Sequence, residues 1–249
     1  MRSILALLAT AFVAHAAPRP PLAPVGTFVH PVSSALVATV AMLRDPAPGH
    51  IATLRTEPHY LTPVSQYLDG VGMPDCVGCG WADIMRTQPP QVHAEIDETW
   101  ALTLWRWARD HGYDPSARGN EQSGSDPLVA SRWLRGHGYL TAAPRRISTE
   151  HEARIAVLTQ CPLGFATPWY QGMDTPDATG MIHRSGIIEG EHYLEAIWFD
   201  QRANQWVFVN SWVGYGPYDR WNQRVTMSAA DVRRLIAWGG YFIVPSKSR

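Results

Sequence analysis

Three residue types in this sequence could together carry out nucleophilic attack on a carbonyl group. Cys76 opens the apolar run of residues 76–85 and follows Pro74-Asp75, which does not fit a helix interior. A helix that begins at Cys76 would favour its thiolate, because the unpaired N–H groups and the dipole of a helix N-terminus attract negative charge. The thiolate is the nucleophilic form of cysteine. Cys76 is therefore the candidate nucleophile, and Cys79, one turn further along, is the alternative.

A histidine and an asparagine further along the chain could supply the base and its orienter. His192 stands at the entry of an apolar strand, and Asn210 ends the next aromatic strand. If the two strands form a hairpin, its open end brings residue 192 near residue 210. The amide oxygen could then accept the imidazole N–H and fix the tautomer that takes the thiol proton. Trp212 follows closely and could shield this hydrogen bond from water.

The elements that must position these residues are helices first and strands later. Apolar periodicity and capping residues predict helices over residues 76–85, 96–107, 127–135, 149–158 and 228–237. Aromatic and β-branched runs predict strands over residues 163–169, 193–199, 206–210 and 241–244. In the second helix, Trp100, Leu104 and Trp107 are spaced for one face. This order predicts an α+β fold with an N-terminal helical lobe and a C-terminal antiparallel β lobe.

The bulk composition is that of a globular protein. Of the 249 residues, 45% are hydrophobic and 17% are charged, which argues against disorder. The formal net charge of -1 gives no electrostatic reason to expect nucleic acid or an anionic membrane as a partner. We find no internal repeat. Three cysteines allow at most one disulfide, and Cys161 is expected in an apolar strand of the core.

The N-terminus has the layout of a secretory signal peptide. Arg2 is followed by the apolar run 4–13, a small-x-small pattern ending at Ala16, and a proline-rich break. We expect residues 1–16 to be this signal, residues 17–50 a Pro/Ala-rich linker or extension, and residues 51–249 the main domain. The mature chain would then be secreted or extracytoplasmic, without stable membrane insertion. If residues 1–16 are instead a structural helix, a virion-associated or cytoplasmic location is expected.

These residues resemble the papain-like cysteine peptidases, in particular their divergent bacterial and phage-type relatives. Three features match in order: a cysteine that opens a helix and is followed by small residues (76–82), Gly-x-His entering a strand (190–192), and Asn-Ser-Trp (210–212). The resemblance covers about residues 51–249 and implies a two-lobed papain-like catalytic domain. It also implies hydrolysis of a peptide or protein substrate through an acyl-thioenzyme, with no cofactor. A metal site is not expected, because the Cys-x-x-Cys pair lacks a second ligand pair.

The family pattern leaves the choice between the two cysteines open. Its best-known members carry Cys-x-x-Cys with the second sulfur nucleophilic and the first in a disulfide, which would select Cys79. Divergent relatives carry a small or acidic residue before the nucleophile, followed by Val and small residues. Asp75-Cys76-Val77 fits this second pattern, so the resemblance favours Cys76.

One departure from the family pattern bears on activity. In the family, a glutamine shortly before the nucleophile donates a hydrogen bond to the oxyanion, but the matching position here is Gly70 for Cys76 or Met73 for Cys79. Gln66 is the nearest glutamine and the candidate donor. Losing one oxyanion donor typically costs on the order of 100- to 1000-fold in rate. Two functions therefore stay open: a cysteine peptidase or amidase, and a weakly active or inactive binding module, for example in virion or cell-envelope assembly.

Overall fold

The computed structural model describes residues 73–87, 93, 95–212, 215 and 223–246. All of them belong to one compact unit of the chain. The predicted signal peptide, the Pro/Ala-rich extension and Gln66 lie outside the described residues. Within the described part, no helix combines the length and the apolar character needed to cross a membrane.

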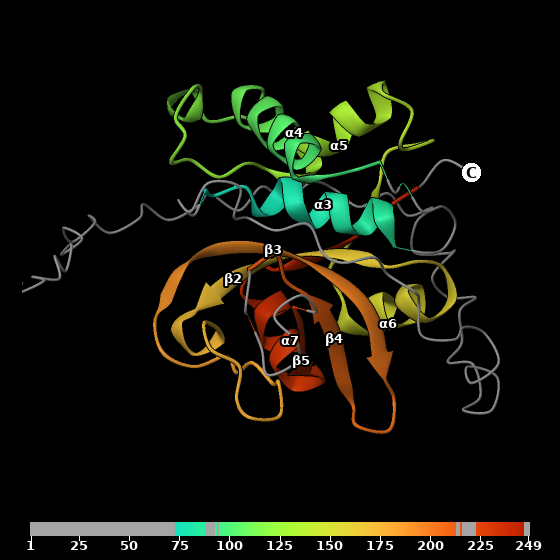
Figure 1. Cartoon of the computed structure of the whole chain (residues 1–249). Coiled ribbons are helices and arrows are strands. Elements are labelled where there is room, and N and C mark those ends of the chain that lie inside the picture. The colour runs from blue at the N-terminus through green and yellow to red at the C-terminus, as the bar shows by residue number, and fades with distance from the viewer. Residues whose placement is uncertain (1–72, 88–92, 94, 213–214, 216–222, 247–249) are drawn as a thin grey trace, which may run out of the picture. The chain divides into compact units, whose positions relative to one another are not determined.

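The described chain begins with three α-helices and one short 3₁₀-helix, in agreement with the predicted helices (Figure 1). They are α3 (Cys76–Arg86), α4 (Glu98–Asp110), η1 (Pro115–Ala117) and α5 (Pro127–Gly136). Two of them start at an aspartate whose carboxylate accepts first-turn N–H groups: Asp97 for α4 and Asp126 for α5. Such a cap satisfies donors that a helix leaves unpaired, which is why the start of α5 at residue 127 was predictable from Asp126, whereas α4 begins two residues after the predicted residue 96.

The buried face of α4 differs from the predicted one. Leu104 is buried as expected, but the buried tryptophan is Trp105, whereas Trp100 and Trp107 are only partly buried. Trp105 is covered by a loop that the helix periodicity does not reveal, and its Nε1 donates to the carbonyl oxygen of Ser123 at 3.1 Å. The apolar stripe of α4 is therefore rotated toward that loop.

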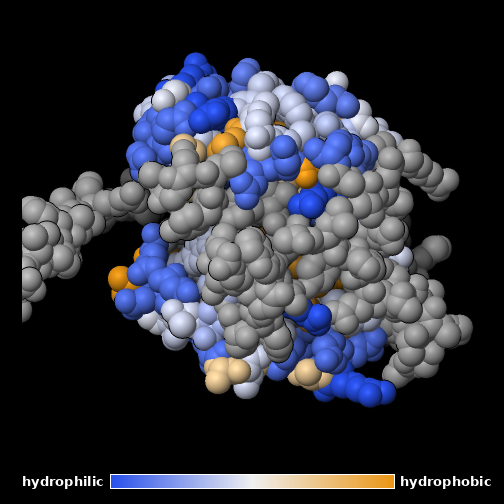
Figure 2. Space-filling model, viewed as in Figure 1, coloured by the Kyte–Doolittle hydropathy of each residue, from blue (hydrophilic) through white to orange (hydrophobic). Residues whose placement is uncertain are grey.

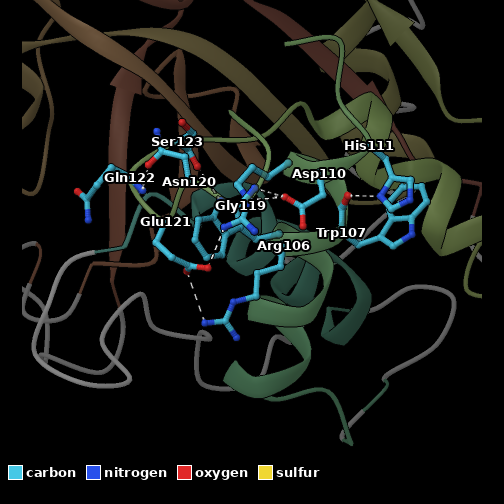
Figure 3. A network of polar contacts seen from close by, with 11 residues as sticks. Arg106, Trp107, Asp110, His111, Gly119, Asn120, Glu121, Gln122 and Ser123 are labelled. Atoms are coloured by element: carbon cyan, nitrogen blue, oxygen red, sulfur yellow. Dashed lines mark hydrogen bonds and ion pairs between the residues drawn. The ribbon is translucent and has the colours of Figure 1, made fainter. Parts of the chain in front are cut away.

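The loop is held against α4 by a polar network (Figure 3). The side chain of Arg109 is 4% exposed and donates to Asp110 at 2.8 Å and to Glu121 at 3.0 Å. The backbone N–H of Gly119 donates to the same Asp110 oxygen at 2.8 Å. A buried guanidinium requires such partners, because burying an unpaired charge is costly. The network thereby holds the loop in place over Trp105.

Helices α4 and α5 end in the same short motif, Trp-x-Arg-x-His-Gly-Tyr, at residues 107–113 and 133–139. In each copy the histidine Nδ1 lies 2.8 Å from the carbonyl oxygen of the tryptophan four residues earlier. The tryptophan and histidine rings also stack in both copies, with centroids 4.1 Å apart in the first and 3.8 Å apart in the second. Figure 3 shows the first copy. The same tryptophan carbonyl also accepts the backbone N–H of that histidine at 3.0 Å in both copies, so the imidazole adds a second hydrogen bond at the helix end. The expectation of no internal repeat was therefore wrong at this scale.

The second half of the chain builds a six-stranded antiparallel sheet with the order β1-β6-β2-β3-β4-β5. Its elements are β1 (Arg145–Ile147), α6 (Glu150–Thr159), β2 (Leu163–Tyr170), η2 (Gln171–Met173), β3 (Ile188–Asp200), β4 (Gln205–Val209), β5 (Arg224–Ser228), α7 (Ala229–Ala237) and β6 (Tyr241–Val244). Strands β3 and β4 form the predicted hairpin, in which Glu195 pairs with Val209. Strands β1 and β5 were not predicted.

The sheet separates two hydrophobic cores. Helix α3 packs against β3 on one face, where Trp81, Ile84 and Tyr193 are buried together. Helices α6 and α7 pack on the other face (Figure 1), where Phe165 stacks on Phe242 with ring centroids 4.3 Å apart. Figure 2 shows mainly hydrophilic residues on the surface over α4 and α5. This arrangement confirms the predicted α+β class, although α6 and α7 lie within the β-rich half.

Candidate active site

Helix α3 begins at Cys76, as predicted, and is packed unusually closely against its neighbours. Asp75 is the N-cap residue but makes no side-chain cap hydrogen bond. A Cβ on Gly78 would lie 2.1 Å from a backbone oxygen of α4, and one on Gly80 would lie 2.6 Å from the ring of Tyr193. Glycine at these two positions therefore lets α3 approach both α4 and β3, and this approach sets the position of Cys76.

The sulfur of Cys76 lies beside the backbone N–H of Tyr193, the residue that directly follows His192. Burial raises the pKa of Cys76 to about 12, with a further contribution from Asp75, against the lowering effect of N–H groups of Tyr193, Val77 and Cys76 itself. The residue as a whole is half-buried. In this conformation the thiol is protonated at neutral pH, so a base must remove its proton before it can act as a nucleophile.

Strands β3 and β4 bring His192 and Asn210 together. The imidazole Nε2 lies 2.8 Å from Asn210 Oδ1, and both side chains are buried. Because an amide oxygen only accepts, Nε2 carries the proton and Nδ1 is left with a lone pair. Asn210 Oδ1 also accepts the N–H of Ser211 at 2.8 Å, which holds the amide in place. The predicted proximity of residues 192 and 210 is therefore present.

The imidazole of His192 is neutral at physiological pH. Burial lowers its pKa to about 4, although the hydrogen bond with Asn210 and the negative charge of Asp174 act in the opposite direction. A neutral imidazole with a free Nδ1 lone pair is the form that can accept a thiol proton. The geometry thus supplies a protonated thiol at the start of α3 and a neutral base on the strand that α3 contacts.

Two tryptophans and a tyrosine enclose His192. The ring of Trp212 lies 4.7 Å from the imidazole, between centroids, at the place expected for the shielding residue. Trp169 lies at the same distance on another side, and Tyr215 packs on Trp212 at 5.3 Å. Trp169 Nε1 also donates to Asp174 at 2.6 Å. Trp169, Tyr215 and Asp174 were not predicted, because they reach His192 through the pairing of β2 with β3 and through loops.

Comparison with solved structures identifies the fold. The chain is similar to xylellain, a cysteine protease from Xylella fastidiosa, with a TM-score of 0.55 and 13% identity over 83% of this chain and 91% of that one. It is also similar to the Carica candamarcensis cysteine protease CMS1MS2 in complex with E-64, with a TM-score of 0.53 and 13% identity over 78% and 100% of the two chains. The chain has the papain-like fold. No protein-family model and no curated protein matches the sequence.

Within this papain-like fold the other two cysteines occupy core positions. Cys79 is fully buried in the core that α3 shares with α4, α5 and the sheet, and its thiol donates to Asp75 Oδ2 at 3.6 Å. Cys161 belongs to the core on the opposite face, as expected, but it precedes β2 instead of lying in a strand. The next residue is Pro162, which has no backbone N–H to donate to a neighbouring strand, so the strand begins after it. None of the three cysteines is disulfide-bonded.

The site contains no evident metal centre. Among the described residues, no group of three or more His, Cys, Asp and Glu side chains could hold a metal ion.

Of the predicted site residues, the papain-like fold brings His192, Asn210 and Trp212 into contact and sets Cys76 beside the same strand. Cys79 faces Asp75 in the core instead.

Proposed function

We propose that this chain is a cysteine peptidase or a related amidase. Cys76 is the nucleophile, His192 the general base and acid, and Asn210 the residue that orients His192. The observation that carries the proposal is the buried 2.8 Å hydrogen bond between His192 and Asn210, on a strand whose next residue contacts the Cys76 sulfur. That both similar structures are cysteine proteases supports the same activity.

The first half of the reaction forms an acyl-thioenzyme. The Cys76 sulfur attacks the substrate carbonyl carbon while its proton passes to Nδ1 of His192. The Nε2–H remains hydrogen bonded to Asn210, which stabilises the imidazolium. The carbonyl oxygen becomes an oxyanion, for which the N-terminus of α3 is a favourable environment and Gln66 is our proposed side-chain donor. His192 then gives its proton to the leaving amine as the carbon–nitrogen bond breaks.

The second half of the reaction hydrolyses the acyl-thioenzyme. A water molecule gives a proton to His192 and attacks the thioester carbon through a second oxyanion. The carbon–sulfur bond breaks, the carboxylic acid leaves, and the proton returns to Cys76. Trp169 and Trp212 cover the imidazole throughout this cycle, so the hydrogen bond with Asn210 is protected from competing water.

A weakly active or inactive binding module is the second candidate. Two observations favour it: the raised pKa of Cys76, about 12, and the presence of Gly70 and Met73 where the family carries its glutamine. Both would make attack by the thiol less favourable without altering the fold. A substrate could still bind in this case, but it would be turned over slowly or not at all.

Covalent labelling distinguishes the two candidates. We would treat the native full-length protein with an E-64-type epoxide, locate the modified cysteine by peptide mass spectrometry, and follow hydrolysis of a fluorogenic peptide library. We expect labelling of Cys76 and hydrolysis that disappears in Cys76→Ala but persists in the matched control Cys161→Ala. Labelling of neither Cys76 nor Cys79 would refute the catalytic proposal. Labelling of Cys76 without any turnover would favour the binding module.

A further inference from the structure

A second thiol lies one helical turn from the proposed nucleophile. Cys76 and Cys79 are the first and fourth residues of α3, and the N–H of Cys79 donates to the carbonyl oxygen of Asp75 at 3.0 Å to close the first turn. Side chains three residues apart in a helix have Cβ atoms about 5–6 Å apart, and a disulfide needs about 3.5–4.5 Å. Cys-x-x-Cys at a helix N-terminus is also the arrangement of disulfide oxidoreductases. A small movement of the first turn would therefore allow a bond.

The carboxylate of Asp75 is placed to assist such a bond. It is 2% exposed and accepts the Cys79 thiol at 3.6 Å. A buried carboxylate in this position can take the thiol proton when Cys79 acts as a nucleophile. The pair thus has one half-buried residue, Cys76, and one fully buried residue whose thiol has its own proton acceptor, Cys79.

The packing of α3 determines which sulfur would move. Gly78 is pressed against α4, where a Cβ would lie 2.1 Å from a backbone oxygen, so the helix cannot shift toward α4 at that point. Cys79 is fixed in the core next to it. The movement therefore falls on Cys76, whose sulfur would leave the N–H of Tyr193 and turn away from the strand that carries His192.

We propose that Cys76 and Cys79 form a reversible disulfide that switches off the site. The regulatory part rests on the proposed peptidase function, whereas the formation of the bond does not. The oxidant is a hydroperoxide. The Cys76 thiol gives up its proton, its sulfur attacks the terminal oxygen and the O–O bond breaks, and the departing alkoxide or hydroxide takes up that proton and leaves as an alcohol or water, which gives a sulfenic acid. Cys79 then transfers its proton to Asp75 and attacks the Cys76 sulfur. The S–O bond breaks, hydroxide takes up that proton as water, and a dithiol reductant restores both thiols.

Cys161 provides an internal control for the assignment. It is buried in the core on the other face of the sheet, with its sulfur 3.8 Å from the carbonyl oxygen of Pro245. The sheet lies between Cys161 and the two thiols of α3, so it cannot take the place of Cys79. Any disulfide formed within one chain is therefore expected to join Cys76 to Cys79.

The test uses the reduced full-length protein and hydrogen peroxide. After oxidation and alkylation, non-reducing peptide mass spectrometry should find the Cys76–Cys79 disulfide in the wild type and in Cys161→Ala. In the wild type, labelling of Cys76 and any hydrolysis should be lost with peroxide and return with dithiothreitol. Before peroxide is added, Cys76 in Cys79→Ala should be labelled as it is in the wild type. Excess peroxide should then convert Cys76 of this variant irreversibly to the sulfinic acid. Asp75→Asn should prolong the life of the sulfenic acid, trapped with dimedone.

The possible failures can be told apart. Absence of the Cys76–Cys79 cross-link, or full recovery of Cys79→Ala by dithiothreitol, would overturn the inference. A cross-link in a protein that never hydrolyses any peptide would leave the disulfide established and remove the peptidase proposal. An equal sulfenic acid lifetime in Asp75→Asn and in the wild type would refute the role of the carboxylate.

Discussion

Gly164 in β2 is a position where a single methyl group should disturb both the fold and the site. A Cβ there would lie 1.8 Å from the hydroxyl oxygen of Tyr193 and 2.4 Å from the ring carbon that bears it, where ordinary contact is 3.4–4 Å. The ring cannot simply retreat toward α3, because Gly80 already contacts its other side. Gly164→Ala must therefore displace Tyr193, and with it the neighbouring His192 and the N–H beside Cys76.

The expected cost follows from two opposing terms. Inserting a methyl group into a well-packed core typically costs about 1–3 kcal/mol, and the blocked ring places Gly164→Ala toward the upper end. Replacing glycine by alanine also restricts the unfolded chain, which offsets about 0.4–1 kcal/mol. We therefore expect a net loss of roughly 2 kcal/mol in the free energy of unfolding. For a chain of this size, such a loss lowers Tm by roughly 4–8 °C.

Tyr193→Phe provides the second side of a double-mutant cycle. The buried Tyr193 hydroxyl has no hydrogen-bond partner among the described residues, so its removal should be neutral or stabilising by up to about 1 kcal/mol. It also removes the closest of the contacts that the methyl group introduced at Gly164 would make, while the ring-carbon contact remains. The double variant should therefore recover part of the loss, with a coupling energy of about 0.5–1.5 kcal/mol.

Urea denaturation of the four proteins measures this cycle. Gly124→Ala is the matched control, because a Cβ there meets no atom within 4 Å, and we expect a change of less than about 0.5 kcal/mol. The labelling rate of Cys76 by iodoacetamide reports the effect on the site in the same variants. The packing argument fails if Gly164→Ala is as stable as Gly124→Ala, or if the effects of the two substitutions are simply additive.

Four further predictions concern the surroundings of His192 and the helix ends. Asn210→Ala should lower kcat/KM about 10- to 100-fold, because an orphaned buried N–H on His192 costs about 1–3 kcal/mol; an unchanged kcat/KM would remove Asn210 from the mechanism. The pH profile of kcat/KM should fall as the pH drops through about 4, where His192 becomes protonated and can no longer accept the thiol proton. Asp174→Asn should move that limb to lower pH, since the carboxylate raises the pKa of His192, and a limb near 6.5 in the wild type would contradict the buried neutral imidazole. His111→Ala and His137→Ala should each lower the free energy of unfolding by about 1 kcal/mol in thermal denaturation, with additive effects, because each removes one hydrogen bond to a helix end.

Much of the fold could be predicted because its signals are local. Asp126 marks the start of α5, since its cap is complete within three residues of the chain. The β3–β4 hairpin is equally local, so the contact between His192 and Asn210 follows once its turn is recognised. The pair of His192 and Asn210 is therefore the part of the candidate site that the sequence specifies best.

Features that depend on distant partners were not predictable in the same way. Trp169 reaches His192 only through the register of β2 against β3, which includes a bulge next to Trp169 itself. Trp105 is covered by a loop that Arg109 holds and lies next to Gly78 of α3, and the periodicity of α4 reveals neither neighbour. Strand β1 has three residues and pairs with the final strand β6, a contact between distant parts of the described chain that leaves little local pattern.

The choice between Cys76 and Cys79 shows where the sequence stops being informative. Three residues of an α-helix rotate the side-chain direction to within about 60° of its starting point, so both cysteines lie on nearly the same side of α3. What separates them is the rotation of the whole helix, which is set by the contacts of Gly78 with α4 and of Gly80 with Tyr193. With those contacts made, Cys79 enters the core and Cys76 faces β3. The small residues beside the cysteines therefore carry as much information about where the two thiols lie as the cysteines themselves.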